Sequence, residues 1–276
     1  MEIRFQSSPK EVRGMNTEEL RSNFLVPQLM NADVLTLVYS HYDRVIVGGV
    51  KPVEQNVILH NEPELKADYF LQRRELGIIN VGGAGVVKAD GVNYELNKLD
   101  ALYLGKETKS VSFTSKTKTD PAIFYLLSTT AHHIYPAVKM TKEQASPVKL
   151  GEKATSNERT IYKYIHEDGI QSCQLVMGLT LLNEGSVWNS VPPHTHTRRT
   201  EVYFYFDLQE TNRAFHFMGE PTETRHLVMN NHEAAISPPW SVHFGCGTSN
   251  YGFIWGMAGE NQAFADMDQV PVAELK

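Results

Sequence analysis

The sequence predicts an all-β fold, a sandwich or barrel with few short helices. Short segments of alternating or β-branched residues recur along the 276 residues, and turn residues separate them at the spacing typical of such folds. The loops at residues 82–85 and 90–91 are rich in glycine and can supply the positive φ angles of tight hairpins. Helix signals, by contrast, are scarce.

The elements of the first half follow in order. A helix is expected over residues 17–24, where Asn16 or Thr17 can cap the N-terminus and the early glutamates interact favourably with the helix dipole. Strands are then expected at residues 34–39, 44–47, 76–80, 85–90, 92–96, 111–113 and 123–127.

A change of composition separates the two halves. Residues 129–159 contain Pro136, Pro147 and a polar cluster, which indicates a crossing between domains. We therefore expect an N-terminal β domain over residues 1–145 and a C-terminal β domain over residues 146–276. Strands of the second half are expected at residues 174–182, 202–206, 214–218, 226–229, 234–237 and 251–257.

The two halves also echo each other weakly. Residues 73–75 and 198–201 each combine arginines with a glutamate directly before an expected strand. A second echo sets residues 100–104 against residues 233–237. Together the echoes favour duplication of one β unit over coincidence.

Composition and charge exclude several classes of protein. Hydrophobic residues make up 41% and charged residues 21%, as in ordinary globular chains, and the formal net charge of −6 argues against broad nucleic-acid binding. No apolar run approaches the roughly 20 residues that span a bilayer, and the N-terminus lacks the apolar core of a secretion signal. Cys173 and Cys246 lack a CxxC spacing. We expect a soluble, cytoplasmic protein with reduced thiols, and neither nucleic acid nor membrane as a partner.

The most informative segment contains His194, His196 and Glu201. Alternation places the two histidines on one face of an extended segment, and Glu201 can return on the adjoining strand as an oxygen ligand. Requiring this acid lowers the chance expectation of such a pattern from roughly 0.4 to roughly 0.05 occurrences. His243, five residues after Pro238, is a fourth candidate ligand. Three imidazoles and one carboxylate suit a first-row divalent metal and leave positions open for water or substrate.

The pattern His-x-His-x4-Glu followed by Pro-x4-His resembles the two metal-binding motifs of the cupin superfamily, which a small antiparallel β-barrel carries. Trp240 stands where cupins usually have a glycine, and Gly185 lies farther from His194 than in the common form. These departures affect the shape of the turns rather than the supply of ligands. The resemblance implies two cupin-type β-barrels, a bicupin.

Over its whole length the chain also resembles the family of 5-keto-4-deoxyuronate isomerases. The resemblance is carried by residues 37–44, 46–49, 69–77, 82–85, 100–103, 155–157, 194–196, 201–206, 223–226 and 253–257. It implies a hexamer with one Zn²⁺ per subunit, held by His194, His196, Glu201 and His243. It also implies an aldose-ketose isomerase that converts 5-dehydro-4-deoxy-D-glucuronate, a keto-uronate of pectin catabolism, to 3-deoxy-D-glycero-2,5-hexodiulosonate. The first β domain lacks an equivalent motif, so we expect metal in the second alone.

Candidates for the chemistry lie near the metal motif. Moving a hydrogen between C1 and C2 needs a polarised carbonyl and a proton shuttle. If Glu201 faces the metal, alternation points Tyr203 and Tyr205 into the same lumen, which makes Tyr203 a catalytic candidate and Tyr205 a substrate contact. Arg225 and His226 are further catalytic candidates, although alternation sets them on opposite sides of their strand. Tyrosines that merely fill the barrel are the alternative interpretation.

A small anionic keto-uronate needs local positive charge, because the net charge of −6 repels it. Arg159, Lys163 and Arg199 are candidates to bind its carboxylate, and arginine is favoured because its planar fork donates two hydrogen bonds. Ordinary surface ion pairs are the alternative for each.

Two other functions fit the same motif. An iron-dependent cupin dioxygenase would use the same ligands, because imidazole suits iron and zinc alike. A non-catalytic sugar-binding bicupin would show binding without turnover, and an intact ligand set argues against it.

Overall fold

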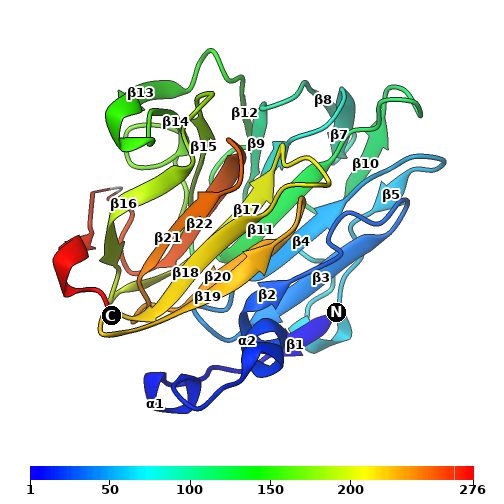
Figure 1. Cartoon of the computed structure of the whole chain (residues 1–276). Coiled ribbons are helices and arrows are strands. Elements are labelled where there is room, and N and C mark those ends of the chain that lie inside the picture. The colour runs from blue at the N-terminus through cyan, green and yellow to red at the C-terminus, as the bar shows by residue number, and fades with distance from the viewer. Residues whose placement is uncertain (264) are drawn as a thin grey trace. The chain divides into compact units, whose positions relative to one another are not determined.

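The computed structural model describes residues 1–263 and 265–276, and strands dominate it (Figure 1). The chain forms two compact units. The first contains residues 1–4, 28–145 and 164–176, and the second contains residues 5–27, 146–163 and 177–276. A single boundary after residue 145 therefore misses two exchanged segments, residues 5–27 and 164–176. Local sequence patterns do not reveal such an exchange, because it depends on which sheet each segment joins.

The first unit is built from two sheets. Its elements are β1 (Glu2–Arg4), β3 (Leu35–Ser40), β4 (Ile46–Val50), β5 (Val57–Ile58), η1 (Pro63–Leu65), β6 (Arg74–Asn80), β7 (Gly85–Ala89), β8 (Val92–Leu96), β9 (Ala101–Leu104), β10 (Val111–Ser115), β11 (Phe124–Thr130) and β12 (Val138–Met140). The larger sheet has the order β1-β3-β4-β11-β6-β9-β12, and the smaller has the order β5-β10-β7-β8. Leu37 and Ile78 from the larger sheet share one buried cluster with Val87 and Phe113 from the smaller sheet. Burial of these apolar faces is the main stabilising contribution.

The second unit also has two sheets. Its elements are α1 (Pro9–Val12), α2 (Thr17–Phe24), β2 (Leu25–Val26), β13 (Ser146–Leu150), η2 (Lys153–Thr155), β14 (Arg159–Ile165), β15 (Val176–Leu182), β16 (Trp188–Thr195), β17 (Arg199–Phe206), β18 (Ala214–Glu220), β19 (Glu223–Met229), β20 (Ala234–Ser237), β21 (His243–Gly247), β22 (Gly252–Gly259), β23 (Asp268–Gln269) and η3 (Val272–Glu274). The larger sheet has the order β13-β14-β15-β22-β17-β20-β2, and the smaller has the order β19-β18-β21-β16-β23. The inner ends of β14 and β15, residues 164–165 and 176, count with the first unit.

Helix α2 begins and ends as the sequence predicts, and Asn16 rather than Thr17 caps it. The Asn16 side chain accepts a hydrogen bond from the Glu19 N–H at 3.0 Å, and the Glu19 carboxylate accepts one from the Asn16 N–H at 2.8 Å. This reciprocal pair satisfies two N–H groups that the first turn leaves unpaired. The helix buries Leu20 and Phe24 and leads into β2, which pairs with β20.

One strand order is repeated in the two units. The run β3-β4-β11-β6-β9 matches β14-β15-β22-β17-β20, and β5-β10-β7-β8 matches β16-β21-β18-β19. The predicted all-β class is confirmed, with each unit made of two sheets rather than one closed barrel. Residues 129–159, expected as a crossing, contribute β12 and β13 as well.

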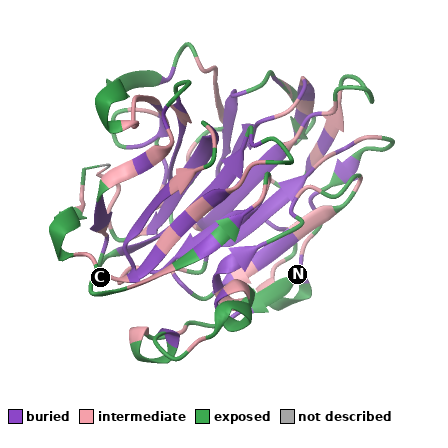
Figure 2. Cartoon of the chain, viewed as in Figure 1, coloured by how far each residue is buried: buried purple, intermediate pink, exposed green. Residues whose placement is uncertain are grey.

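The strands of the second unit differ strongly in how far their residues are buried. All eight residues of β17 are buried, whereas all five residues of β13 are exposed (Figure 2). Within residues 1–263 and 265–276, no helix has both the length and the apolar character needed to cross a membrane.

Candidate metal centre

Four side chains of the second unit converge on one point. His194 lies on β16, His196 directly follows that strand, Glu201 lies on β17, and His243 begins β21. Each offers one ligand atom, and these atoms all lie within 4.8 Å of one another. All four residues are buried, with at most 8% of any one exposed. The group can therefore hold a metal ion away from bulk water.

The two sheets of the unit bring these residues together. β16 and β21 are neighbours, and His194 is paired directly with His243. A turn in which the Ser241 N–H donates to the Pro238 carbonyl at 2.9 Å sets the start of β21. Glu201 comes from the other sheet, where β17 pairs with β20 and β22. The expectation that Glu201 returns on the strand adjoining the histidines was wrong, because the chain crosses to the other sheet between His196 and β17.

The hydrogen bonds of two imidazoles fix where their lone pairs point. His196 Nδ1 lies 2.8 Å from the Asp266 carbonyl oxygen, and His243 Nδ1 lies 3.2 Å from the Ser241 carbonyl oxygen. A carbonyl only accepts, so each Nδ1 carries the hydrogen and each Nε2 presents a lone pair to the centre. Such a backbone partner is the usual means of orienting a metal-binding histidine.

The inward atoms lie very close together. Oε2 of Glu201 is 3.0 Å from His196 Nε2 and 2.8 Å from His243 Nε2, and His243 Nε2 is 3.0 Å from His194 Nε2. Lone pairs and a carboxylate at this distance repel one another unless a proton or a cation lies between them. The arrangement is therefore that of a cation site.

The protonation states fit the same conclusion. Burial, reinforced by the nearby His243 imidazole, lowers the pKa of His194 to about 2, so this imidazole is neutral at pH 7. Burial by itself raises the pKa of Glu201, but the adjacent His243 and His196 imidazoles lower it more, so that pKa lies well below its usual value. Neutral imidazole and ionised carboxylate are the forms that bind metals.

A cavity of about 240 Å³ opens onto His194, His196 and Glu201. Its other lining residues are Leu150, Arg159, Ile161, Thr180, Ser190, Val191, Pro192, Tyr203, Phe253, Trp255, Met257, Met267 and Gln269. The Tyr203 hydroxyl lies 2.7 Å from the Ser190 hydroxyl, and burial raises the pKa of Tyr203 well above its usual value. Tyr203 is thus a neutral hydroxyl beside the ligands.

Arg159 is the one lysine or arginine among the described residues that line this cavity. Its Nη1 donates to the Asn157 carbonyl at 2.9 Å, which fixes one side of the guanidinium. Burial lowers its pKa, yet a guanidinium stays protonated at neutral pH. Arg159 therefore supplies the local positive charge that an anionic ligand requires.

Three predicted substrate contacts do not line the cavity. Tyr205 is buried behind Tyr203 with its hydroxyl 2.9 Å from His216 Nδ1, and Lys163 does not reach the cavity wall. Arg199 donates to the carbonyls of Asn261 and Ala263 at 3.1 and 2.8 Å, so it anchors the segment that carries the Asp266 carbonyl. All three residues belong to the second unit. Alternation predicts the face of the sheet on which a side chain lies, but not whether that part of the strand borders the cavity.

The catalytic candidates Arg225 and His226 lie outside the centre. Arg225 donates to the backbone carbonyls of Arg13 and Met15 and so ties down the N-terminal segment. His226 is exposed on β19. The reason is the strand order: β19 is the edge strand of its sheet, separated from β16 by β18 and β21.

Sequence reasoning missed several residues of the centre. Ser190 lies four residues before His194 on β16, but the register of that strand shifts between Asn189 and His194, so alternation does not predict where its side chain points. His216 lies on the buried face of β18 and is bonded at both nitrogens, to the hydroxyls of Tyr205 and Ser237. Asp266 acts through its backbone carbonyl, which leaves no side-chain signal.

Solved structures with low sequence identity share the fold. An IolB-like protein from Salmonella typhimurium LT2 aligns with a TM-score of 0.68 at 14% identity, covering 90% of this chain and 97% of that one. Oxalate decarboxylase from Lactobacillus farciminis aligns with a TM-score of 0.55 at 9% identity, covering 79% of this chain and 77% of that one. Both likenesses support the cupin-like, two-unit β architecture.

Sequence relatives are much more similar. Proteins named 4-deoxy-L-threo-5-hexosulose-uronate ketol-isomerase from Halalkalibacterium halodurans and Shouchella clausii are 52% and 53% identical over 276 residues. The protein of that name from Dickeya dadantii is 51% identical over 278 residues, and each alignment covers 100% of both chains. The model of the KduI/IolB family matches residues 24–272. This chain therefore belongs to the KduI/IolB family.

Proposed function

We propose that this protein is a metal-dependent ketol-isomerase that converts 4-deoxy-L-threo-5-hexosulose uronate to 3-deoxy-D-glycero-2,5-hexodiulosonate. The observation that carries the proposal is the pair of inward Nε2 lone pairs of His196 and His243, 3.0 and 2.8 Å from the Glu201 carboxylate. His196 and Glu201 line a cavity whose described wall contains one guanidinium, that of Arg159. The full-length relatives of the same name supply the substrate class. The reaction is an intramolecular oxidation and reduction, because the aldehyde carbon is reduced to a primary alcohol while the neighbouring hydroxyl carbon is oxidised to a ketone.

We assign one Zn²⁺ per subunit to the four ligands. Metal–ligand distances of 2.0–2.1 Å set neighbouring ligand atoms roughly 2.8 to 3.4 Å apart, for ligand–metal–ligand angles between a right angle and the tetrahedral value. The separations of 2.8 and 3.0 Å among Glu201, His196, His243 and His194 are close to this range. A divalent ion held there would polarise the substrate carbonyl and acidify the neighbouring C–H group.

The chain's own residues have separate tasks in this scheme. The Arg159 guanidinium binds the substrate carboxylate, because it is the permanent positive charge of the described cavity wall. The Tyr203 hydroxyl, bonded to Ser190, holds a proton that it exchanges with a substrate oxygen. Apolar walls such as Phe253 and Trp255 exclude water, which strengthens both interactions.

The decisive experiment follows the isomerisation directly. The purified, metal-loaded protein is incubated with the open-chain keto-uronate in deuterated water, and the product is identified by NMR. We expect the 2,5-diketo isomer, with solvent deuterium at the transferred position if an enediolate forms. Oxygen consumption without isomer would instead indicate the iron-dependent dioxygenase, and binding without turnover would indicate a sugar-binding bicupin.

We further propose a hexameric enzyme of the cytoplasm that acts in pectin breakdown. Two free cysteines, Cys173 and Cys246, are compatible with a reducing compartment. Light scattering on the purified protein tests the assembly, with six subunits expected and a monomer contradicting it.

A further inference from the structure

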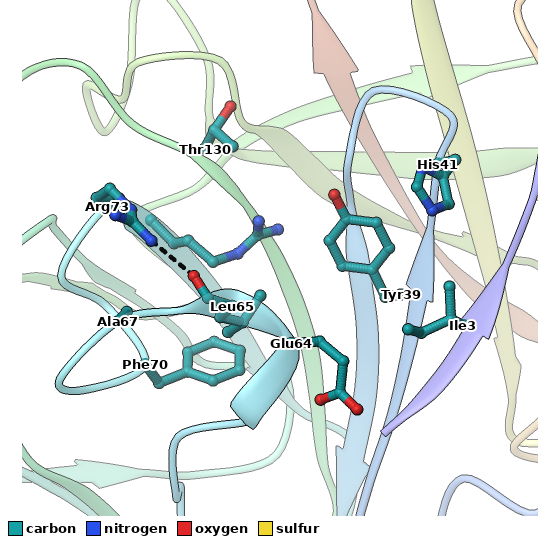
Figure 3. A pocket seen from close by; sticks show the side chains of 10 residues that line it. Ile3, Tyr39, His41, Glu64, Leu65, Ala67, Phe70, Arg73 and Thr130 are labelled. Carbon is teal, nitrogen blue, oxygen red and sulfur yellow. Dashed lines mark hydrogen bonds between the residues drawn. The ribbon is translucent and has the colours of Figure 1, made fainter.

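A second cavity, of about 340 Å³, lies within the first unit (Figure 3). Ten residues line it: Ile3, Tyr39, His41, Glu64, Leu65, Ala67, Phe70, Arg73, Arg74 and Thr130. All of them belong to the first unit, and the metal ligands belong to the second. The volume falls within the range of small-molecule sites.

Arg74 brings a buried positive charge to this cavity. Only 5% of the residue is exposed. Its Nε donates to the Ser128 hydroxyl at 3.1 Å, and its Nη2 donates to the carbonyls of Arg44 and Ser128 at 2.6 and 3.0 Å. Every one of these acceptors is neutral, and among the described residues Nη1 has no hydrogen-bond partner.

The charge of Arg74 persists in spite of burial. Burial lowers the pKa of this guanidinium to about 10, so it is still protonated at neutral pH. The Tyr39 ring lies 5.9 Å away and offsets part of the desolvation. A buried cation without an anionic partner is costly, so the site favours a bound anion.

The charge of the neighbouring carboxylate, Glu75, helps to keep Arg74 protonated, but the hydrogen bonds of the guanidinium go to other groups. Glu75 follows Arg74 on β6, and alternation directs it to the opposite face. Its oxygens accept hydrogen bonds from the Tyr103 hydroxyl at 2.7 Å and from three successive backbone N–H groups, those of residues 173–175, at 2.7, 2.8 and 2.9 Å. Glu75 is thus fully committed elsewhere.

A second arginine extends the positive wall. Arg73 is exposed, and its Nη2 donates to the carbonyls of Leu65 and Lys66 at 2.6 and 2.7 Å. Its Nε and Nη1 are left for a ligand. With two arginines and Glu64, and with His41 counted as neutral, the wall carries one net positive charge. This balance matches a monoanion such as a carboxylate better than a phosphate dianion.

The rest of the wall suits a ligand with an organic body. Figure 3 shows Arg73 and Phe70 on one side of the cavity and Tyr39 on the other, with Thr130 at one end. The aromatic rings can pack against C–H groups, and the Tyr39 and Thr130 hydroxyls can bond to hydroxyl groups of a ligand. We propose that this cavity is a second ligand site, which binds a small organic carboxylate of sugar-acid size through Arg74 and Arg73.

The test measures binding rather than turnover, so it is independent of the proposed isomerase activity. D-galacturonate is titrated by ligand-observed NMR into the metal-loaded Arg159→Gln protein, which lacks the guanidinium of the other cavity. Inorganic phosphate and neutral D-galactose are titrated in parallel. We expect galacturonate to bind, and galactose and phosphate to bind at least about tenfold more weakly.

Matched variants locate the site. Arg74→Gln and Arg73→Gln are each expected to weaken galacturonate binding about tenfold or more, whereas Lys88→Gln, an equal change of charge at an exposed position of the same unit, leaves it within about twofold. Arg73 is exposed, so its variant tests the site even if the Arg74 variant does not fold. Equal affinity in the Arg73 and Lys88 variants, or phosphate binding as tightly as galacturonate, overturns the proposal.

Discussion

Leu76 occupies in the first unit the strand position that Glu201 occupies in the second. On β6, Leu76 pairs with Leu104 of β9 and Ser128 of β11. On β17, Glu201 pairs with Ser237 of β20 and Met257 of β22, which are the matching strands of the second unit. The sequence echo between the two halves aligns Glu75 with Glu201. In the structure, however, Glu75 lies one residue before the position equivalent to Glu201, so its side chain points to the opposite face of the sheet. The first unit thus has an apolar side chain where the second has a metal ligand.

Loss of one imidazole should empty the metal centre. His196→Ala removes a lone pair that lies 3.0 Å from the Glu201 carboxylate, and we expect bound metal to fall by about tenfold or more, with isomerase activity falling in parallel. Elemental analysis of the purified protein measures this. His226→Ala, at an exposed position on β19, should keep its full metal content. Undiminished metal in the His196 variant would contradict the assignment.

Much of the fold could be predicted from sequence because its signals are local. Alternation and turn residues placed β7, β8 and β20 within a residue of their bounds, and the helix at Thr17–Phe24 was predicted with its true ends. The exchange of residues 5–27 between the units was missed, because pairing of β2 with β20 is a long-range event.

The centre could be predicted only in part, for a similar reason. The four ligands stand out because each needs a particular side chain at a fixed spacing. Arg225 was predicted to lie at the site because it stands next to His226 in the sequence. Both residues lie on β19, which β18 and β21 separate from β16, and residue spacing does not encode this strand order. Likewise, only coordinates reveal that Arg199 bonds backbone carbonyls instead of a ligand.

Arg159 should govern substrate affinity. It is the one guanidinium in the described wall of the metal cavity, so Arg159→Gln removes a charge-assisted hydrogen bond to the substrate carboxylate. We expect KM to rise about 10- to 100-fold while metal content stays unchanged. Steady-state kinetics with the keto-uronate measures this. Lys163→Gln, outside the cavity, serves as the control and should change KM less than about twofold.

Tyr203 and Tyr205 offer a matched pair for proton transfer. Tyr203 lines the cavity and bonds to Ser190, whereas Tyr205 lies behind it and bonds to His216. We expect Tyr203→Phe to lower kcat about 100-fold or more with little change in KM. Tyr205→Phe should lower kcat less than about tenfold. Equal losses in both variants would show that the effect is one of packing instead of proton exchange.

His216 should make folding stability depend on pH. Burial, with the His243 imidazole adding to it, lowers the pKa of His216 to about 3, from an ordinary value of 6.5. Between these two pH values the unfolded chain binds a proton that the folded chain does not, so the free energy of unfolding falls as the pH falls. The loss is at most about 1.4 kcal/mol for each pH unit, and this contribution is constant above pH 6.5.

Replacing His216 isolates its contribution to the pH dependence of the free energy of unfolding. His216→Gln keeps one donor and one acceptor for the hydroxyls of Tyr205 and Ser237 but cannot titrate. Urea unfolding at a series of pH values from 7 to 4.5 should therefore give a shallower loss of stability in the variant than in the natural protein. Metal release in acid affects both proteins alike, so the difference between the two slopes reports on His216. Parallel slopes would mean that His216 takes up a proton in the folded protein at the same pH as in the unfolded chain, which would contradict its lowered pKa.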